Sequence, residues 1–272
     1  MNRIGLAFAA AALSLAASAA GPVAFVADLH GNASIEGDGK VAFLAELNAG
    51  TRLLLGTGAT VAVTYATSGT EFTLRGPGEF VVTESEVKAD KGAAPAKRQV
   101  SSVQDGGVIA RVSKTATASL RMRNVAAPAA RNALDFPVDT KIATLQPELR
   151  WSQVSREGAE VKLLDASGKE LWKAAAQSGA ARPAVKLSAG TRYRWTVMTP
   201  GGAIGEAQFE TLSADALMKV AKSKSAAKGF SERVMHAFVL HDLGATQEAR
   251  SAWADLSRER PDLPELAALA RQ

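Results

Sequence analysis

Residues 60–82 read TVAVTYATSGTEFTLRGPGEFVV. Apolar side chains alternate with small or polar ones on both sides of Ser68-Gly69, and Gly76-Pro77-Gly78 interrupts this alternation before a further apolar run. An alternation with a period of two is typical of a strand that buries one face, while Ser-Gly and Gly-Pro-Gly are typical of turns. The stretch therefore predicts three short strands joined by tight turns.

The same pattern continues outward and predicts an all-β unit over residues 21–136. On the N-terminal side, Val23, Phe25, Ala27 and Leu29 share one strand face, and Asp38-Gly39 predicts a tight hairpin turn. On the C-terminal side we expect a hairpin tip or linker at 91–98, strands at 108–112 and 115–122, and a linker at 126–130. Short strands without a long helical pattern indicate a sandwich, a barrel or a solenoid-like sheet.

Three segments of this unit, 47–53, 58–63 and 68–78, share a recognisable order. Leucine and glycine precede a strand, small residues fill the next strand, and a hairpin leads to the Gly-Pro-Gly corner. In this order residues 25–90 resemble a FecR-like domain. The best-known members of that family relay receptor occupancy at the outer membrane to a cytoplasmic sigma factor, through a membrane-spanning helix and a cytoplasmic N-terminal segment. The sequence predicts neither part, so the resemblance implies an extracytoplasmic β interaction module.

Residues 137–212 predict a second β unit, an immunoglobulin-like sandwich of about seven short strands. Alternation appears at 147–151, 159–164, 187–197 and 208–211, and Asp165-Ala166-Ser167-Gly168 predicts a turn. Leu187, Gly190 and Tyr193 match a tyrosine corner and Trp151 matches a core tryptophan, so this unit resembles a fibronectin type III domain. Trp172, Tyr193 and Trp195 could instead form a strip on which carbohydrate stacks, but aromatic residues at a period of two more often belong to a core.

Residues 213–272 change to a helical period. Ser213 is expected to cap a first helix, Ser231-Glu232 to start a second that ends at Gly244, and a third to run over 246–260. Pro261 stops the third helix, and Pro264 suits the start of a final short one. The matching residues Gly244, Ala249, Trp253, Leu256 and Pro261 make the segment resemble one tetratricopeptide repeat, although Ala237 and Leu240 depart from the pattern.

One such repeat cannot bury its apolar face alone. It is expected to pack on the preceding helix, on the sandwich or on a partner chain. In the last case the helices would be a docking surface.

The first twenty residues predict export. Arg3 precedes an apolar run from Ile4 to Ala17, which closes on Ala17-Ser18-Ala19-Ala20. This order is typical of a secretory signal peptide cleaved near Ala20. The run is shorter than the roughly 20 residues that span a bilayer, so an uncleaved anchor is the less favoured alternative. We expect a periplasmic mature protein without a transmembrane span.

Composition limits the chemistry and the partners. The 272 residues contain no cysteine and three histidines, and the net charge is +5. The absence of cysteine excludes disulfides, thiol nucleophiles and cysteine metal sites. The basic excess concentrates between Lys88 and Arg131 and predicts a candidate interaction surface of Lys97, Arg98, Arg111, Lys114, Arg121 and Arg123. Its expected partner is anionic envelope material, such as an acidic envelope protein, an anionic glycan or lipid head groups, and not a nucleic acid, while a solvated surface without a ligand is the open alternative.

The sequence predicts no catalytic, cofactor-binding or metal-binding residues. Asp28 and His30 share a strand face, but a metal site needs a third ligand. His236 and His241 are five residues apart, which places them about 140° apart around a helix. No glycine-rich phosphate loop and no Gly-x-Ser-x-Gly elbow occurs.

Together these observations predict a mainly β protein of four parts. They are a signal peptide (1–20), a FecR-like β domain (21–136), a fibronectin type III-like sandwich (137–212) and a tetratricopeptide-like helical segment (213–272). The expected function is that of a non-enzymatic scaffold or interaction protein of the cell envelope, without a cofactor, that binds a periplasmic protein. A glycan- or peptidoglycan-binding module and a FecR-type signalling regulator are the alternatives.

Overall fold

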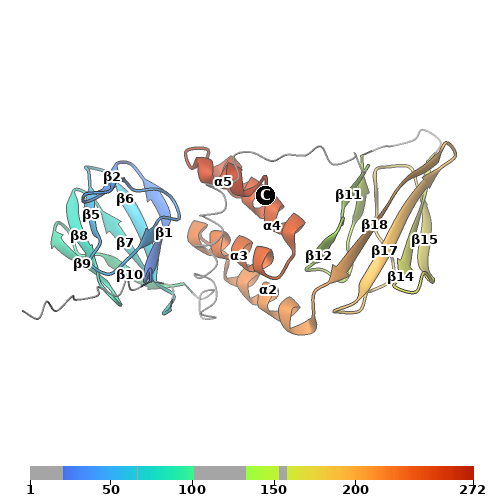
Figure 1. The fold of residues 1–272 in the computed structure, drawn as a ribbon, viewed down its shortest axis with the longest axis horizontal. Coiled ribbons are helices and arrows are strands. Elements are labelled where there is room, and N and C mark those ends of the chain that lie inside the picture. Colours follow the sequence, from blue (N-terminus) through green and yellow to red (C-terminus); the bar gives the residue numbers. More distant parts are fainter. Residues whose placement is uncertain (1–20, 66, 101–132, 153–157) are drawn as a thin grey trace, which may run out of the picture.

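The computed structural model describes residues 21–65, 67–100, 133–152 and 158–272. Within them the chain is mainly β, with several antiparallel sheets followed by a small helical segment at the C-terminal end (Figure 1). This confirms the expected fold class. The predicted signal peptide, the strands at 108–112 and 115–122 and the linker at 126–130 lie outside the described residues.

The first sandwich consists of strands β1 to β10. Among the described residues these strands form two five-stranded sheets, in the orders β10-β7-β6-β1-β4 and β3-β2-β5-β8-β9. Apolar side chains of both sheets, including Val63, Leu74, Leu53 and Phe80, fill the space between them. The strands are β1 (Ala24–His30), β2 (Ala33–Ile35), β3 (Gly39–Lys40), β4 (Glu46–Leu47), β5 (Arg52–Leu55), β6 (Thr60–Tyr65), β7 (Thr70–Arg75), β8 (Gly78–Val82), β9 (Val87–Lys91) and β10 (Ala96–Gln99).

The three strands expected within residues 60–82 are present as β6, β7 and β8. β6 and β7 form a hairpin, but β8 pairs with β5 and β9 in the opposite sheet. The Gly-Pro-Gly corner therefore carries the chain from one sheet to the other. A Cβ at Gly76 would lie 2.0 Å from the carbonyl oxygen of Gly56, so only glycine allows this crossing.

Of the two alternatives expected at 91–98, the hairpin tip is wrong, and a linker is present at residues 92–95. β9 pairs with β8 and β10 pairs with β7, so residues 92–95 connect the two sheets. A tight turn does join β2 to β3, but it consists of residues 36–38, and Gly39 already belongs to β3. Gly37 and Gly39 adopt φ of 81° and 86°.

The second sandwich consists of strands β11 to β18. Its described strands form a three-stranded sheet, β11-β13-β16, and a five-stranded sheet, β12-β18-β17-β14-β15, in which only the β12–β18 pair is parallel. β11 belongs to this sandwich although it precedes the expected boundary at 136. The strands are β11 (Leu134–Phe136), β12 (Thr140–Ile142), β13 (Leu149–Trp151), β14 (Ala159–Asp165), β15 (Glu170–Ala176), β16 (Ala180–Ala181), β17 (Arg192–Thr199) and β18 (Gly202–Thr211).

The aromatic residues of the second sandwich belong to its core. Trp195 is fully buried and donates from Nε1 to the Pro137 carbonyl oxygen at 2.8 Å. The Tyr193 hydroxyl accepts a hydrogen bond from the Ser188 amide at 2.9 Å, which is the backbone contact expected of a tyrosine corner. Because Tyr193 and Trp195 are buried, they cannot form the carbohydrate strip considered above.

The described helices are α2 (Ala214–Ala226), α3 (Phe230–Asp242), α4 (Thr246–Glu259) and α5 (Pro264–Leu269). Their ends follow the sequence signals. The Ser213 hydroxyl accepts from the Ala216 amide at 3.3 Å, and Pro264 is the first residue of α5. Gly244 separates α3 from α4 at a φ of 84°, which side chains rarely adopt.

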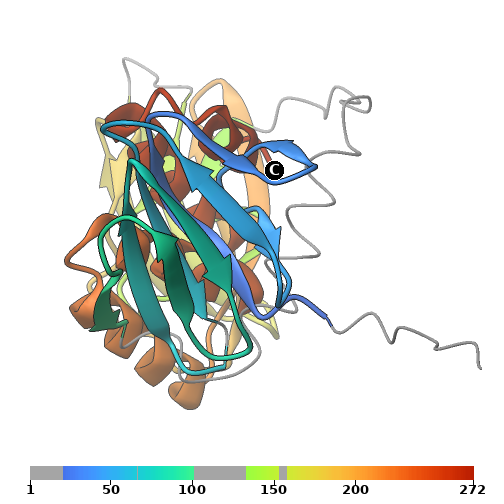
Figure 2. The ribbon, with the colours of Figure 1, turned by 90° about the vertical axis from the view of Figure 1, so that its left-hand side faces the viewer.

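The helices lie between the two sandwiches (Figure 1). Figure 2 shows the first sandwich in front of them. Phe25 and Ala27 of β1 and Phe43 join one apolar cluster with Val234 and Phe238 of α3. Of the alternatives predicted for the repeat, packing on the preceding helix and on sheet surfaces of the same chain is present.

Polar contacts attach the helices to the second sandwich. The Gln247 side chain accepts from the Val138 amide and donates to the Asp135 carbonyl oxygen, both at 2.8 Å. The Glu248 carboxylate accepts from the Ala143 amide at 2.8 Å. The helical segment therefore connects the two sandwiches and buries its apolar face within the chain.

Candidate functional site

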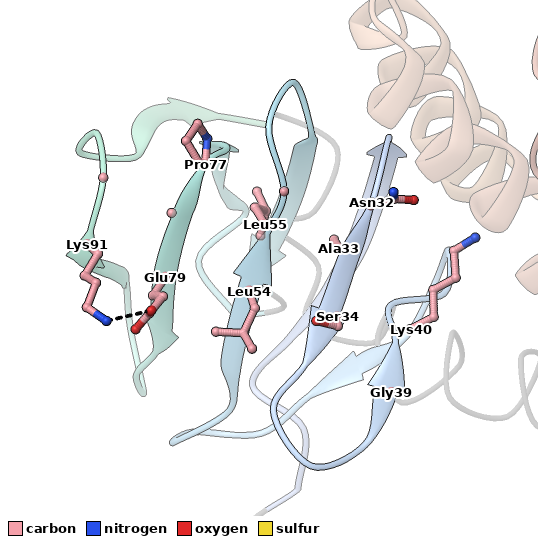
Figure 3. A pocket seen from close by; sticks show the side chains of 13 residues that line it. Asn32, Ala33, Ser34, Gly39, Lys40, Leu54, Leu55, Pro77, Glu79 and Lys91 are labelled. Atoms are coloured by element: carbon pink, nitrogen blue, oxygen red, sulfur yellow. Dashed lines mark hydrogen bonds and ion pairs between the residues drawn. The ribbon is translucent and has the colours of Figure 1, made fainter.

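A groove of about 870 Å³ lies on the second sheet of the first sandwich. It crosses strands β2, β5 and β8 and reaches β3 and β9 at its ends (Figure 3). Its volume lies within the range of ligand-binding clefts. The residues that line the groove are Asn32, Ala33, Ser34, Gly39, Lys40, Leu54, Leu55, Gly56, Pro77, Gly78, Glu79, Lys91 and Gly92.

Strand register places five of these side chains in one row. Partners across neighbouring antiparallel strands project from the same face of a sheet. Lys91 pairs with Glu79, Glu79 with Leu54, Leu54 with Ser34, and Ser34 with Lys40. The row gives the groove an apolar centre at Leu54 and a lysine at each end.

The two lysines differ in their surroundings. Lys91 Nζ lies 2.7 Å from Glu79 Oε1, so the Glu79 carboxylate neutralises this end of the groove. Lys40 is exposed and has no ion-pair partner among the residues that the structure describes. In Figure 3 its ammonium group points away from the Glu79–Lys91 pair. The Lys40 end can therefore receive a negatively charged group.

Two glycines allow close backbone contacts at one end of the groove. A Cβ at Gly78 would lie 2.8 Å from the Lys91 carbonyl oxygen, and one at Gly92 would lie 2.8 Å from the Pro77 carbonyl oxygen. Gly92 also has a φ of 101°. The corner that moves the chain between the sheets thus also shapes the end of the groove.

Only two of the residues in the predicted interaction surface are described. Lys97 lies over the Phe72 ring, with Nζ 5.9 Å from the ring centre. Arg98 donates from Nε to Glu71 at 2.6 Å and also pairs with Glu232 of α3. Because the Glu71 side chain is 2% exposed, Arg98 is held as a bridge from β10 to α3 and its charge is already satisfied. Arg111, Lys114, Arg121 and Arg123 lie outside the described residues.

His30 and His236 contact side chains of this chain. His30 Nε2 lies 3.5 Å from Asp28, and Asp28 also pairs with Arg260, which lies just beyond α4. Among the described residues no group of three or more histidines and carboxylates could hold a metal ion. The His236 Nδ1 and the Ser223 hydroxyl are 2.8 Å apart, and burial lowers the pKa of His236.

Sequence reasoning missed the groove because its side chains are individually ordinary. Ser34, Leu54 and Glu79 come from three strands and share no motif. The available signal was the glycine-rich corner, which predicted a turn without indicating what lies beside it.

Among the described residues, the helices are too short or too polar to span a bilayer.

No protein-family model matches the chain, and no curated protein matches it. Among solved structures it is similar to the BSP domain of a biofilm-associated protein, at 15% identity and a TM-score of 0.23. The match covers 72% of this chain and 26% of that one.

Proposed function

We propose that this chain is an exported, non-enzymatic interaction protein of the cell envelope that binds a segment of a partner protein in the groove. The proposal includes export through the predicted signal peptide, cleavage near Ala20 and a periplasmic location. It also includes the resemblance of the modules to FecR-like, fibronectin type III and tetratricopeptide units. The observation that carries it is the row from Lys91 to Lys40 across the first sandwich.

The chemistry of the row favours an extended polypeptide segment. Leu54 offers an apolar contact at the centre, Ser34 offers a hydroxyl, and Lys40 offers an ammonium group without an ion-pair partner among the described residues. Strands hold these groups at fixed spacing, which lowers the entropy lost on binding. An apolar side chain followed by a carboxylate in a partner segment would match the centre and the Lys40 end.

A glycan ligand is less well supported. Sugar rings commonly stack on exposed aromatic faces, and none of the residues that line the groove is aromatic. Tyr193 and Trp195 of the second sandwich are buried. The groove therefore favours a protein over a polysaccharide.

A photo-cross-linking side chain at residue 54 of the full chain, expressed in its native host, tests the proposal. We expect a discrete adduct with one envelope protein, weakened by Lys40→Glu. The matched control places the same cross-linker at exposed Lys169 in the second sandwich, where no adduct is expected. Equal adducts at both positions, or none at residue 54, would contradict the groove as the binding site. Recovery of the unprocessed chain from the cytosol would contradict export.

Point substitutions are preferable to deletion of residues 213–272. Without the helices, Phe25 and Phe43 of the first sandwich would lose their apolar neighbours. If that deletion abolished partner binding, the loss could result from the newly exposed apolar residues as well as from the missing helices.

A further inference from the structure

Strand β15 forms an open edge of the second sandwich. It pairs with β14 on one side, and no other described strand pairs with its second side. All seven residues from Glu170 to Ala176 are exposed or partly exposed. Figure 1 shows β15 on the side of the second sandwich that faces away from the helices. Within the described part of the chain, this edge is free to accept a strand from another molecule.

The other edge strands of the described sheets are short, charged or covered. β3, β4 and β16 have two residues each, and β11 has three. Three of the five residues of β9 are charged, and β10 is attached to α3 through Arg98. β12 is covered by the helical segment, because the Lys141 amide donates to the Gly244 carbonyl oxygen at 3.1 Å. Such features prevent association between edges, and β15 is the longest edge strand without a cover.

Alternate residues of β15 direct their backbone groups toward the open edge. The Asp165 amide donates to the Lys169 carbonyl oxygen at 3.0 Å, in the turn between β14 and β15. Backbone groups alternate in direction along a strand, so every second residue of β14 counted back from Asp165 also faces β15. The register assigns these residues the following partners in β15: Trp172, Ala174 and Ala176. Lys173 and Ala175 therefore direct their amides and carbonyls outward.

The open edge is complementary to a second copy of itself. Two β15 strands can pair in antiparallel orientation about a two-fold axis at Ala174. Trp172 of each copy then lies opposite Ala176 of the other copy, and Lys173 lies opposite Ala175. Each large side chain meets an alanine, and the outward amides and carbonyls of Lys173 and Ala175 meet one another.

Other symmetric registers fit less well. An axis at Lys173 would place two ammonium groups directly opposite each other, which is destabilising. An axis at Trp172 would place two indoles opposite each other and would include Leu171, where the register with β14 shifts. An axis at Ala175 would extend the pairing beyond the end of β15. The axis at Ala174 uses only 172–176, which pair with β14 without interruption.

We infer that the second sandwich binds a second copy of this chain through β15, in the antiparallel register centred on Ala174. The pairing joins two five-stranded sheets into one continuous sheet. Lys173 Nζ lies 3.8 Å from Glu160 of its own chain, so each ammonium group near the axis keeps a carboxylate beside it. A contact of this length is small, so we expect a reversible dimer whose population rises with protein concentration. This inference does not depend on the groove, and a cross-link between two copies is recognised by its mass.

Opposite charges introduced at residue 175 test the register. Sedimentation equilibrium of the full chain over a wide concentration range measures the dissociation constant of the dimer. Ala175→Glu places a carboxylate opposite Lys173 of the other copy at two symmetric positions and is expected to tighten the dimer about 2- to 30-fold. Ala175→Lys is expected to weaken it by a similar factor. In the monomer the order is reversed, because residue 175 lies opposite Glu160 of β14, so altered monomer stability would not give this result.

A proline tests the backbone contacts. Ala175→Pro removes an outward amide that the pairing with β14 does not use, and it is expected to abolish dimerisation while the sandwich stays folded. Circular dichroism checks that each variant is folded. The matched controls, Ala189→Glu and Ala189→Lys, change an exposed alanine of the second sandwich outside β15 and are expected to dimerise as the unchanged chain does.

Three results would overturn the inference. The first is a monomer at every concentration. The second is a dimer that Ala175→Pro leaves intact. The third is a dissociation constant that Ala175→Glu and Ala175→Lys shift in the same direction, because only pairing opposite Lys173 predicts opposite shifts.

Discussion

Replacing Arg260 with methionine tests whether an ionic contact fastens the first sandwich to the helices. The Arg260 side chain is 10% exposed, and its guanidinium pairs with Asp28 of β1 and with Asp262. It also donates to the Leu29 carbonyl oxygen at 2.7 Å and lies over the Phe230 ring. The contacts with Asp28 and Leu29 join residues that are 232 and 231 positions apart in the sequence.

The expected loss follows from the groups that would remain. Removing the guanidinium leaves the Leu29 carbonyl without its donor and Asp28, whose side chain is 23% exposed, without its cation. A buried acceptor left unpaired costs about 1–3 kcal/mol, and breaking a buried ion pair costs about 3–5 kcal/mol. Asp28 keeps contacts with the Leu29 amide and His30, so we expect a smaller loss of about 2–4 kcal/mol in the free energy of unfolding.

Urea unfolding followed by circular dichroism measures this loss, with Arg258→Met as the matched control. Arg258 also pairs with a carboxylate, Asp255, but the two side chains are 75% and 68% exposed. An exposed pair contributes about 0–1 kcal/mol. Adding Asp28→Asn to Arg260→Met should recover part of the lost stability, because an unpaired carboxylate is removed. Equal losses in the Arg260 and Arg258 variants, or no recovery in the double variant, would refute the reasoning.

Two further predictions concern pH and the corner between the sheets. Burial and the charge of Lys224 lower the pKa of His236, so the folded chain favours the neutral ring. The neutral ring therefore contributes to stability above about pH 6.5, and this contribution is lost as the pH falls through the lowered pKa of His236. His236→Gln should flatten the dependence of the melting temperature on pH in this range, and an unchanged slope would contradict the prediction. Gly76→Ala should destabilise the chain by about 3 kcal/mol or more in urea, because its Cβ would lie 2.0 Å from a carbonyl oxygen. The control Gly201→Ala, whose nearest atom is 3.7 Å away, should change stability little, and similar losses at both positions would contradict the steric argument.

Local features of the fold were predictable because neighbouring residues determine them. The Ser213 cap, the end of α3 at Gly244 and the hydrogen bond between Tyr193 and Ser188 each depend on groups within a few positions. The hairpin of β6 and β7 follows from alternation around Ser68-Gly69 in the same way. Side-chain period and turn chemistry were sufficient for these elements.

Pairing across long distances was not predictable in this way. Alternation indicated that residues 78–82 form a strand. This strand, β8, pairs with β5 and β9, whereas the preceding strand β7 lies in the other sheet. The expectation of a hairpin tip at 91–98 failed for the same reason. A period of two gives the buried face of a strand and contains no information about its partner.

The sequence by itself determined that this chain alternates short strands, joins them with glycine-containing turns and has helices after the strands, the first of them capped by Ser213. The tertiary structure alone decided what its charged residues do. Arg98 belonged to a predicted binding surface, but Glu71 and Glu232 make it a bridge between β10 and α3. Lys40 and Leu54, ordinary in the sequence, lie in one row of a groove. A charged side chain is paired or unpaired depending on which groups, distant in the sequence, the fold brings within a few ångströms of it. Local composition does not predict those distances.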